Sequence, residues 1–249
     1  KKILVLNLMV LIMINLGKKR DLVFKIEENQ KIHLNTKNKG ITYTVISCLA
    51  IVSMVIGLFV YSTVAEKELT NDQYKLLKFY QLNTKRDLNA FSLFKNNEEF
   101  TNADFLGKWD LVFLGFASCP DMCPMTMQKL SKTSDLLSQK EGLIDKINFV
   151  MISIDPDRDS PERMHEYATA FNADFVGVSG GIKDIYQLSL NLTLPFTPIV
   201  NSKNKDYDMD HSMNLALIDP QGKYYGFFKT PYNPETIAEA LESVIKFAK

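Results

Sequence analysis

Residues 116–124 read Phe116-Ala117-Ser118-Cys119-Pro120-Asp121-Met122-Cys123-Pro124, with two cysteines four positions apart. An apolar run typical of a buried strand, 111–116, precedes the pair, and a stretch with helical periodicity, 125–137, follows it. This spacing predicts both sulfurs on one face of a helical turn, close enough to form a disulfide or to bind one soft metal ion. A helix N-terminus also lowers the pKa of a thiol and favours the thiolate. The site is therefore a redox pair, a metal site, or both.

Strands and helices alternate around this stretch. A short strand with a turn at Asn96-Asn97 comes first, and a hairpin around Asp219-Pro220-Gln221-Gly222 comes late. Alternation that ends in a hairpin and a last helix predicts an α/β domain with a central mixed sheet. A cysteine pair where a strand passes into a helix is typical of a thioredoxin-like fold. Further predicted strands span 147–154, 175–178, 213–218 and 224–228, and further predicted helices span 161–171, 182–190 and 234–247.

The chain also has one candidate membrane segment. Residues 41–65 form an uncharged run of 25 residues, and a helix needs roughly 20 apolar residues to cross a bilayer. Seven basic residues lie in 18–39, whereas 66–72 holds three acidic residues and one lysine. The positive-inside rule then places the N-terminus in the cytoplasm and the chain after residue 66 on the other side. A buried core helix and a cleaved signal peptide are the alternatives.

The parts around this segment are expected to differ. Residues 1–40 are predicted to be a cytoplasmic N-terminal segment, in which the apolar stretch 3–16 is short for a span. We interpret that stretch as interfacial or as translated sequence upstream of the native start. A signal-like segment or a second short membrane segment are further alternatives. Residues 66–87 are predicted to be a partly helical tether, and 88–249 to form the thioredoxin-like domain.

Composition limits the classes of partner. The chain has 249 residues with 29 basic and 29 acidic side chains, so its net charge gives no indication of nucleic-acid binding. It has three cysteines, and Cys48 lies inside the apolar run, where packing is its expected role. The other two form one local pair, so the chain is not a small fold held together by disulfides.

His211 is the second candidate site residue. It lies in Asp210-His211-Ser212, just before the predicted strand 213–218. In the thioredoxin plan, the loop before this hairpin faces the cysteine pair. Two thiolates and one imidazole suit a cuprous ion at low coordination number, whereas zinc would need a fourth ligand. Asp208 or Asp210 is expected either to orient the imidazole or only to solvate the loop.

Other candidate residues carry weaker expectations. His33 and His165 are poor ligand candidates, the first in the N-terminal segment and the second expected on a helix surface. The acidic cluster 155–159 is interpreted mainly as a turn followed by a helix cap at Ser160. Met122 and Met125 could offer soft sulfur, although packing is the expected role. The predicted core aromatics are Phe94, Phe100, Phe105 and Trp109.

Three separated motifs resemble those of the Sco/SenC family. They are Gly115-Phe116-x-x-Cys119-Pro120-Asp121-x-Cys123-Pro124, Ile154-Asp155-Pro156-x-Arg158-Asp159-x-Pro161-Glu162, and Asp210-His211-Ser212 followed by Leu217-Ile218-Asp219-Pro220-x-Gly222. The resemblance covers about 88–248, and Ala117 and Asn97 depart from the usual Thr or Ser and the usual Gly. It implies a membrane-tethered thioredoxin-fold protein of the bacterial periplasm or the mitochondrial intermembrane space. It also implies copper binding through Cys119, Cys123 and His211.

Two functions follow from the residues and the resemblance. The first is a copper metallochaperone that helps build the binuclear copper site of cytochrome c oxidase subunit II. The second is a thiol–disulfide oxidoreductase in which Cys119 and Cys123 are the catalytic redox pair. His211 distinguishes them, because a pure reductase does not need it. A peroxidase is a weaker third hypothesis. The expected partners also include a periplasmic copper donor or thiol reductant. The expected location is the bacterial inner membrane.

Overall fold

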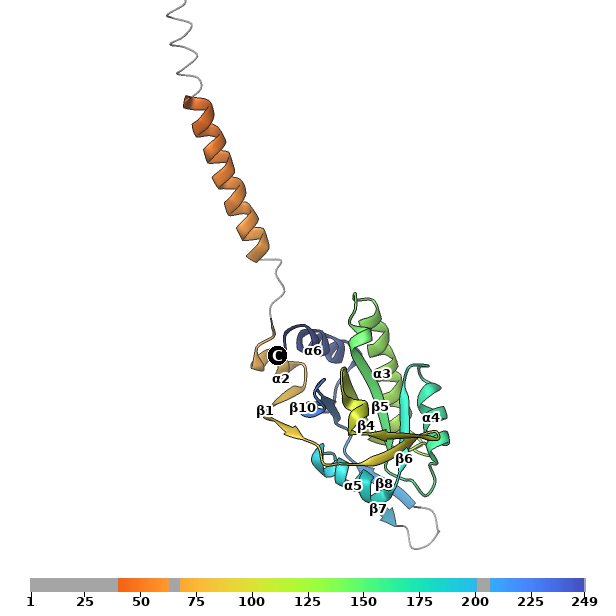
Figure 1. The fold of residues 1–249 in the computed structure, drawn as a ribbon. Coiled ribbons are helices and arrows are strands. Elements are labelled where there is room, and N and C mark those ends of the chain that lie inside the picture. Colours follow the sequence, from red (N-terminus) through yellow and green to blue (C-terminus); the bar gives the residue numbers. More distant parts are fainter. Residues whose placement is uncertain (1–39, 63–67, 201–206, 249) are drawn as a thin grey trace, which may run out of the picture. The chain divides into compact units, whose positions relative to one another are not determined.

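The structure, a computed structural model, describes residues 40–62, 68–200 and 207–248 (Figure 1). The chain divides into two compact units, Lys1–Glu66 and Lys67–Lys249, which are described separately. In the first unit, Gly40–Ser62 is a 23-residue helix, long and apolar enough to cross a membrane by length and composition. Cys48 is an exposed free cysteine of this helix. The predicted N-terminal segment, except for Gly40, lies outside the described residues.

The second unit is built on an eight-stranded sheet with the order β1-β10-β9-β4-β5-β6-β2-β3. β4 runs parallel to β5, and β5 runs parallel to β6, whereas the other pairs are antiparallel. The predicted central mixed sheet is therefore confirmed. Its strands are β1 Phe79–Asp87, β2 Ser92–Lys95, β3 Glu98–Thr101, β4 Trp109–Gly115, β5 Ile147–Ser153, β6 Val176–Gly180, β9 Leu215–Ile218 and β10 Lys223–Phe228.

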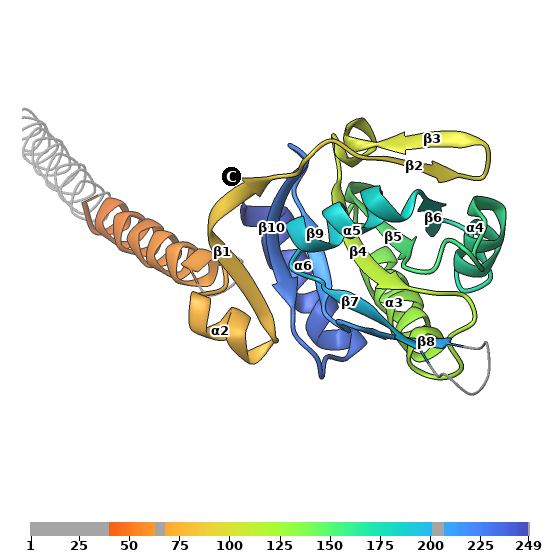
Figure 2. The same ribbon diagram turned by 90° about the horizontal axis from the view of Figure 1, so that it is seen from below.

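Helices cover both faces of this sheet. Figures 1 and 2 show α3 and α6 on one face, and α5 with the separate hairpin of β7 and β8 on the other. α4 begins after the cap of Ser160, whose hydroxyl accepts from the Arg163 N–H, with proline at the first helical position. The helices are α2 Asn71–Leu76, α3 Met122–Ser138, α4 Pro161–Thr169, α5 Ile182–Asn191 and α6 Pro234–Phe247, and the hairpin joins β7 Phe196–Val200 to β8 Tyr207–His211.

The core lies against the central strands. Every residue of β4 is buried, which explains why residues 111–114 are continuously apolar and not alternating. Trp109, Phe100 and Phe105 are buried, as predicted. Phe94 is 40% exposed, which corrects its assignment to the core. Successive strand residues face opposite sides, so in β2 the buried Leu93 takes the inward position and Phe94 faces outward.

The structure differs from the sequence prediction at the start of the second unit. Residues 66–87 were expected to form a tether, but Phe79–Asp87 is strand β1 and pairs with β10 at one edge of the sheet. Most of β1 is exposed or half-buried, so its sequence lacks the apolar pattern of a central strand. The hairpin of β7 and β8 was not predicted either. His211 is therefore the last residue of a strand and does not lie in a loop.

Candidate metal centre

The cysteines lie where β4 passes into α3. β4 ends at Gly115, and α3 begins at Met122 with Asp121 as its first flanking residue. Cys123 lies in the first turn of α3 and is fully buried, whereas Cys119 lies in the preceding loop and is half-buried. The expectation that both sulfurs share one face of a helix is thus wrong for Cys119. A residue before proline disfavours the helical conformation, and Pro120 follows Cys119 directly.

The two thiols are free and close together. The N–H of Cys123 donates to the sulfur of Cys119 at 3.4 Å, which brings the loop thiol over the helix N-terminus. Burial raises the pKa of the Cys123 thiol, although the sequence prediction expected the helix N-terminus to lower it. Cys123 is therefore a neutral thiol at pH 7 when no metal is bound. A metal that binds there must displace this proton.

His211, the last residue of β8, lies next to Cys123 although it is 88 positions away in the sequence. Its Nε2 lies 3.9 Å from the sulfur of Cys123. Its Nδ1 lies 3.1 Å from the backbone oxygen of Ser212, which can only accept, so this contact requires a proton on Nδ1. The imidazole is flanked by the rings of Phe113 and Phe116, with centroids 6.0 and 6.1 Å away. The fold thus brings the imidazole of His211 next to the sulfur of Cys123.

The spacing of these atoms is compatible with a shared ion. A metal about 2.3 Å from a thiolate sulfur and about 2.0 Å from an imidazole nitrogen keeps those atoms roughly 3.5–4.3 Å apart, for angles from tetrahedral to linear. The 3.9 Å between Cys123 and His211 falls in that range. Within residues 40–62, 68–200 and 207–248, however, no three His, Cys, Asp or Glu side chains already converge tightly enough to hold a metal. A metal held by three donors at this place would therefore require Cys119 to turn inward from its loop.

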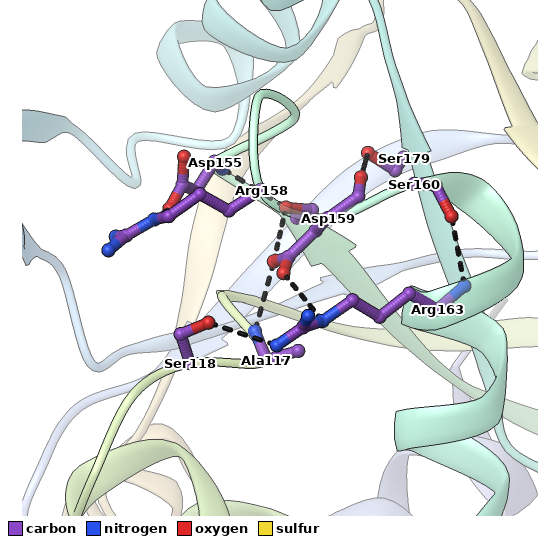
Figure 3. Close-up of polar contacts among 9 residues, drawn as sticks. Ala117, Ser118, Asp155, Arg158, Asp159, Ser160, Arg163 and Ser179 are labelled. Atoms are coloured by element: carbon purple, nitrogen blue, oxygen red, sulfur yellow. Dashed lines mark hydrogen bonds and ion pairs between the residues drawn. The ribbon is translucent and has the colours of Figure 1, made fainter.

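The buried side chain of Asp159 holds the loop that contains Cys119. Its carboxylate is fully buried, and one oxygen accepts from the Ala117 N–H and the Ser153 hydroxyl, both at 2.9 Å. The other oxygen lies 3.6 Å from Nε of Arg163, and the same guanidinium donates to the hydroxyl of Ser118 at 3.1 Å (Figure 3). Two consecutive residues just before Cys119 are therefore held by one carboxylate and one arginine.

The remaining part of the acidic cluster adjoins an aromatic ring of the centre. Asp155 is buried and forms an ion pair with Arg158, whose guanidinium lies 5.6 Å above the ring of Phe116. The sequence interpretation of 155–159 as a turn and a cap is confirmed by the helix start, but it missed the buried carboxylates. The sequence did contain a signal for this position. The charged run follows β5, and β5 is parallel to β4, so the run leaves the sheet at the same edge as the cysteine loop.

Gly115 leaves room for the buried sulfur. A Cβ at this position would lie 3.0 Å from the sulfur of Cys123, and 2.8 Å from both Met151 Cε and Phe113 Cε1. Those separations are shorter than carbon atoms tolerate without displacement. Glycine at the end of β4 therefore leaves the space that the side chain of Cys123 occupies.

The other predicted residues fall outside this centre or behave differently. The acceptor for His211 Nδ1 is the Ser212 carbonyl, a role that the sequence assigned to Asp208 or Asp210. Asp210 is exposed, and the side chain of Asp208 lies outside the described residues, as does His33. His165 is half-buried in α4, and burial lowers its pKa. Met122 and Met125 are exposed, contrary to their expected packing role.

Comparisons with known proteins agree on one family. The model of the SCO1/SenC family matches residues 81–246. Protein sco1 of Schizosaccharomyces pombe is 36% identical over 157 residues, covering 62% of this chain and 59% of the relative. The SCO2-like protein of Rickettsia felis is 32% identical over 206 residues, covering 80% of this chain and 96% of the relative. The chain spans about half the length of the human and zebrafish (Danio rerio) relatives it matches, between 43% and 52%.

Solved structures give the same result. The crystal structure of yeast Sco1 with copper bound superimposes with a TM-score of 0.59 at 29% identity, covering 66% of this chain and 91% of that one. The thioredoxin-like fold predicted from the strand-to-helix cysteine pair is borne out by this likeness.

Proposed function

This chain belongs to the SCO1/SenC family, and from that premise we propose that it is a membrane-anchored copper metallochaperone. It binds copper through Cys119, Cys123 and His211 and assists assembly of the binuclear copper site of cytochrome c oxidase. The observation that carries this proposal is the approach of His211 Nε2 to within 3.9 Å of the Cys123 sulfur. The two residues are 88 positions apart in the sequence, so only the fold can bring them together.

The donor atoms fit a cuprous cargo. Thiolate sulfur is a soft ligand, and imidazole suits copper as well, so this set favours Cu(I) at low coordination number. The hydrogen bond from Nδ1 to Ser212 supports the proposal because it orients the ring with Nε2 toward the Cys123 sulfur. Copper-bound Sco structures in the same family, such as that of yeast Sco1, add to this support.

A thiol–disulfide oxidoreductase is the second candidate function. It is favoured by the two free thiols, one of them half-buried at the surface, at the start of a helix. The two functions overlap, because the thiols must be reduced to bind Cu(I) and could also reduce cysteines of a client. The imidazole separates them, since thiol exchange needs only two sulfurs and access to them.

Replacing His211 with alanine is expected to weaken Cu(I) binding while leaving disulfide formation intact. The variant loses a ligand, so its affinity should fall by more than the roughly 10–100-fold that removal of an outer partner costs. A competition titration with a cuprous chelator measures this loss, and the reduction potential of the dithiol is measured in parallel. His165→Ala, which removes a half-buried imidazole from α4, is the matched control and should retain wild-type affinity. Equal affinities in both variants would leave the oxidoreductase as the better candidate.

We further propose that Gly40–Ser62 anchors the chain in a bacterial inner membrane, with the thioredoxin-like domain in the periplasm. The support is the uncharged helix and the excess of basic residues before it. In this arrangement the domain meets its expected partners, a copper donor or thiol reductant and subunit II of cytochrome c oxidase. Residues 1–40 would then be cytoplasmic.

Alkaline phosphatase fused after Lys249 is expected to be active in bacterial cells, because this enzyme needs export to form its disulfides. The same reporter fused after Gly40 is expected to be inactive. The pair of fusions controls for expression, since each is quantified by immunoblot. Activity of only the Gly40 fusion would reverse the proposed orientation.

A further inference from the structure

Two methionines lie beside the cysteines with their side chains in solvent. Met122 and Met125 belong to the first turn of α3, on either side of Cys123, and are 46% and 45% exposed. Residues three positions apart are neighbours on a helix surface, so the two thioethers share one face at the edge of the centre. The next methionine of α3, Met127, is only 1% exposed and packs in the core.

This exposure is unusual for the methionines of the domain. In the described residues of the second unit, Met122 and Met125 are the only methionines among the strongly exposed large apolar side chains. Four others are buried and one is half-buried; these are Met127, Met151, Met164, Met209 and Met213. Core packing therefore does not explain the two at the cysteine loop.

The sulfur atoms around the centre become progressively less accessible. The thioethers of Met122 and Met125 lie outermost, Cys119 is half-buried, and Cys123 is fully buried next to His211. A metal ion that approaches from solvent therefore meets methionine side chains that are more exposed than either cysteine. A thioether is a soft donor for Cu(I) that has no proton to lose, so it can bind the ion before any thiol is deprotonated.

We propose that Met122 and Met125 form an outer docking site for Cu(I), through which the ion enters and leaves the inner centre. This inference rests on the proposed function, because it assigns a path to the ion that the inner residues bind. Transfer inward is a ligand exchange without a redox change. Copper–thioether bonds break as copper–thiolate bonds form, the copper stays cuprous, and each thiol that becomes a ligand gives its proton to solvent.

The direct test observes the methionine methyl groups of the full chain in detergent, labelled with carbon-13. Ag(I) serves as a redox-stable substitute for Cu(I), and the Cys119→Ser/Cys123→Ser variant removes the inner thiols. The methyl resonances of Met122 and Met125 are expected to shift at lower Ag(I) than those of the other eight methionines. If the serine variant does not fold, the same measurement on the wild-type chain loaded with one equivalent replaces it. Shifts that are absent, or equal across all methionines, would overturn the proposal.

The second test measures transfer rates. Leucine preserves the apolar volume of methionine but not its sulfur, so Met122→Leu/Met125→Leu isolates the thioethers from any apolar contact with a partner. Uptake of Cu(I) from a chelator should slow by at least about tenfold, the lower end of the effect of removing an outer group at a metal site. The equilibrium affinity should change much less than the rate, since the three inner ligands are intact.

Met213→Leu, which removes a half-buried sulfur two residues after His211, is the matched control and should transfer copper at the wild-type rate. Wild-type rates in the double leucine variant would contradict the docking site and would point to an apolar contact instead. Failure of the wild-type chain to bind Cu(I) through its inner residues would contradict the proposed function. The two failures are therefore distinguishable.

Discussion

Oxidation of Cys119 and Cys123 to a disulfide is expected to abolish stoichiometric Cu(I) binding without unfolding the domain. The disulfide removes two of three proposed ligands at once. Cys123 belongs to the core and Cys119 packs against it, but most of the core consists of the apolar side chains of β4 and its neighbours, so the domain should stay folded. The oxidised and reduced chains are compared by copper content, by the number of free thiols, and by circular dichroism, which reports whether the domain is folded.

Cys48→Ser provides the matched control for this experiment. Cys48 is the third free cysteine of the chain and lies in the apolar helix, so its removal should change neither copper content nor the effect of oxidation. An oxidised protein that retains one equivalent of Cu(I) would place the site elsewhere. An oxidised protein that unfolds would mean that the loop and the core are coupled more strongly than the contacts indicate.

Replacing Asp159 with alanine is expected to destabilise the domain and to weaken copper binding together. The variant leaves the Ala117 N–H and the Ser153 hydroxyl without their acceptor, and each unpaired buried donor costs about 1–3 kcal/mol. The expected loss of unfolding free energy is thus roughly 2–5 kcal/mol, with Arg163 also deprived of its buried partner. Because Ala117 lies two residues before Cys119, the released loop should hold that ligand less well. Urea unfolding and the chelator competition measure the two effects.

Two further variants make this result specific. Asp157→Ala removes an exposed carboxylate of the same cluster and should change stability by less than about 0.5 kcal/mol. Asp159→Asn keeps an acceptor oxygen for the Ala117 N–H and should recover part of the lost affinity. An Asp159→Ala protein as stable as Asp157→Ala, with wild-type copper affinity, would show that the carboxylate does not position the loop.

The buried elements of the fold were predictable because their sequence patterns are strong. The continuous apolar run of β4, the helix after it and the capped helix at Ser160 all lie close to their predicted places. β1 was missed because it is an edge strand in which only Phe79 is buried, so it lacks the alternation that identifies a half-buried strand. The hairpin of β7 and β8 was missed because it is outside the main sheet.

The candidate site was predictable in its residue types and less so in its geometry. The spacing of Cys119 and Cys123 and the motif around His211 indicated which side chains would meet. Their local conformations depend on tertiary contacts that leave little trace in sequence, such as the burial that raises the pKa of the Cys123 thiol. The role of Asp159 was hidden for the same reason, because a carboxylate in a charged run usually faces solvent, and only the fold buries it.

Gly115 limits the mutational paths open to this sequence. Glycine and alanine codons differ by one nucleotide, so the substitution arises often, yet here its methyl group would collide with three side chains at once. Adjacent positions in a packed core do not vary independently, and the cost of a change at one depends on the residues at the others. Alanine at 115 therefore requires the side chains of Phe113 and Met151 to shift or become smaller and the Cys123 sulfur to give way. Lineages that keep the cysteine are therefore expected to keep the glycine, or to replace it only after such permissive substitutions.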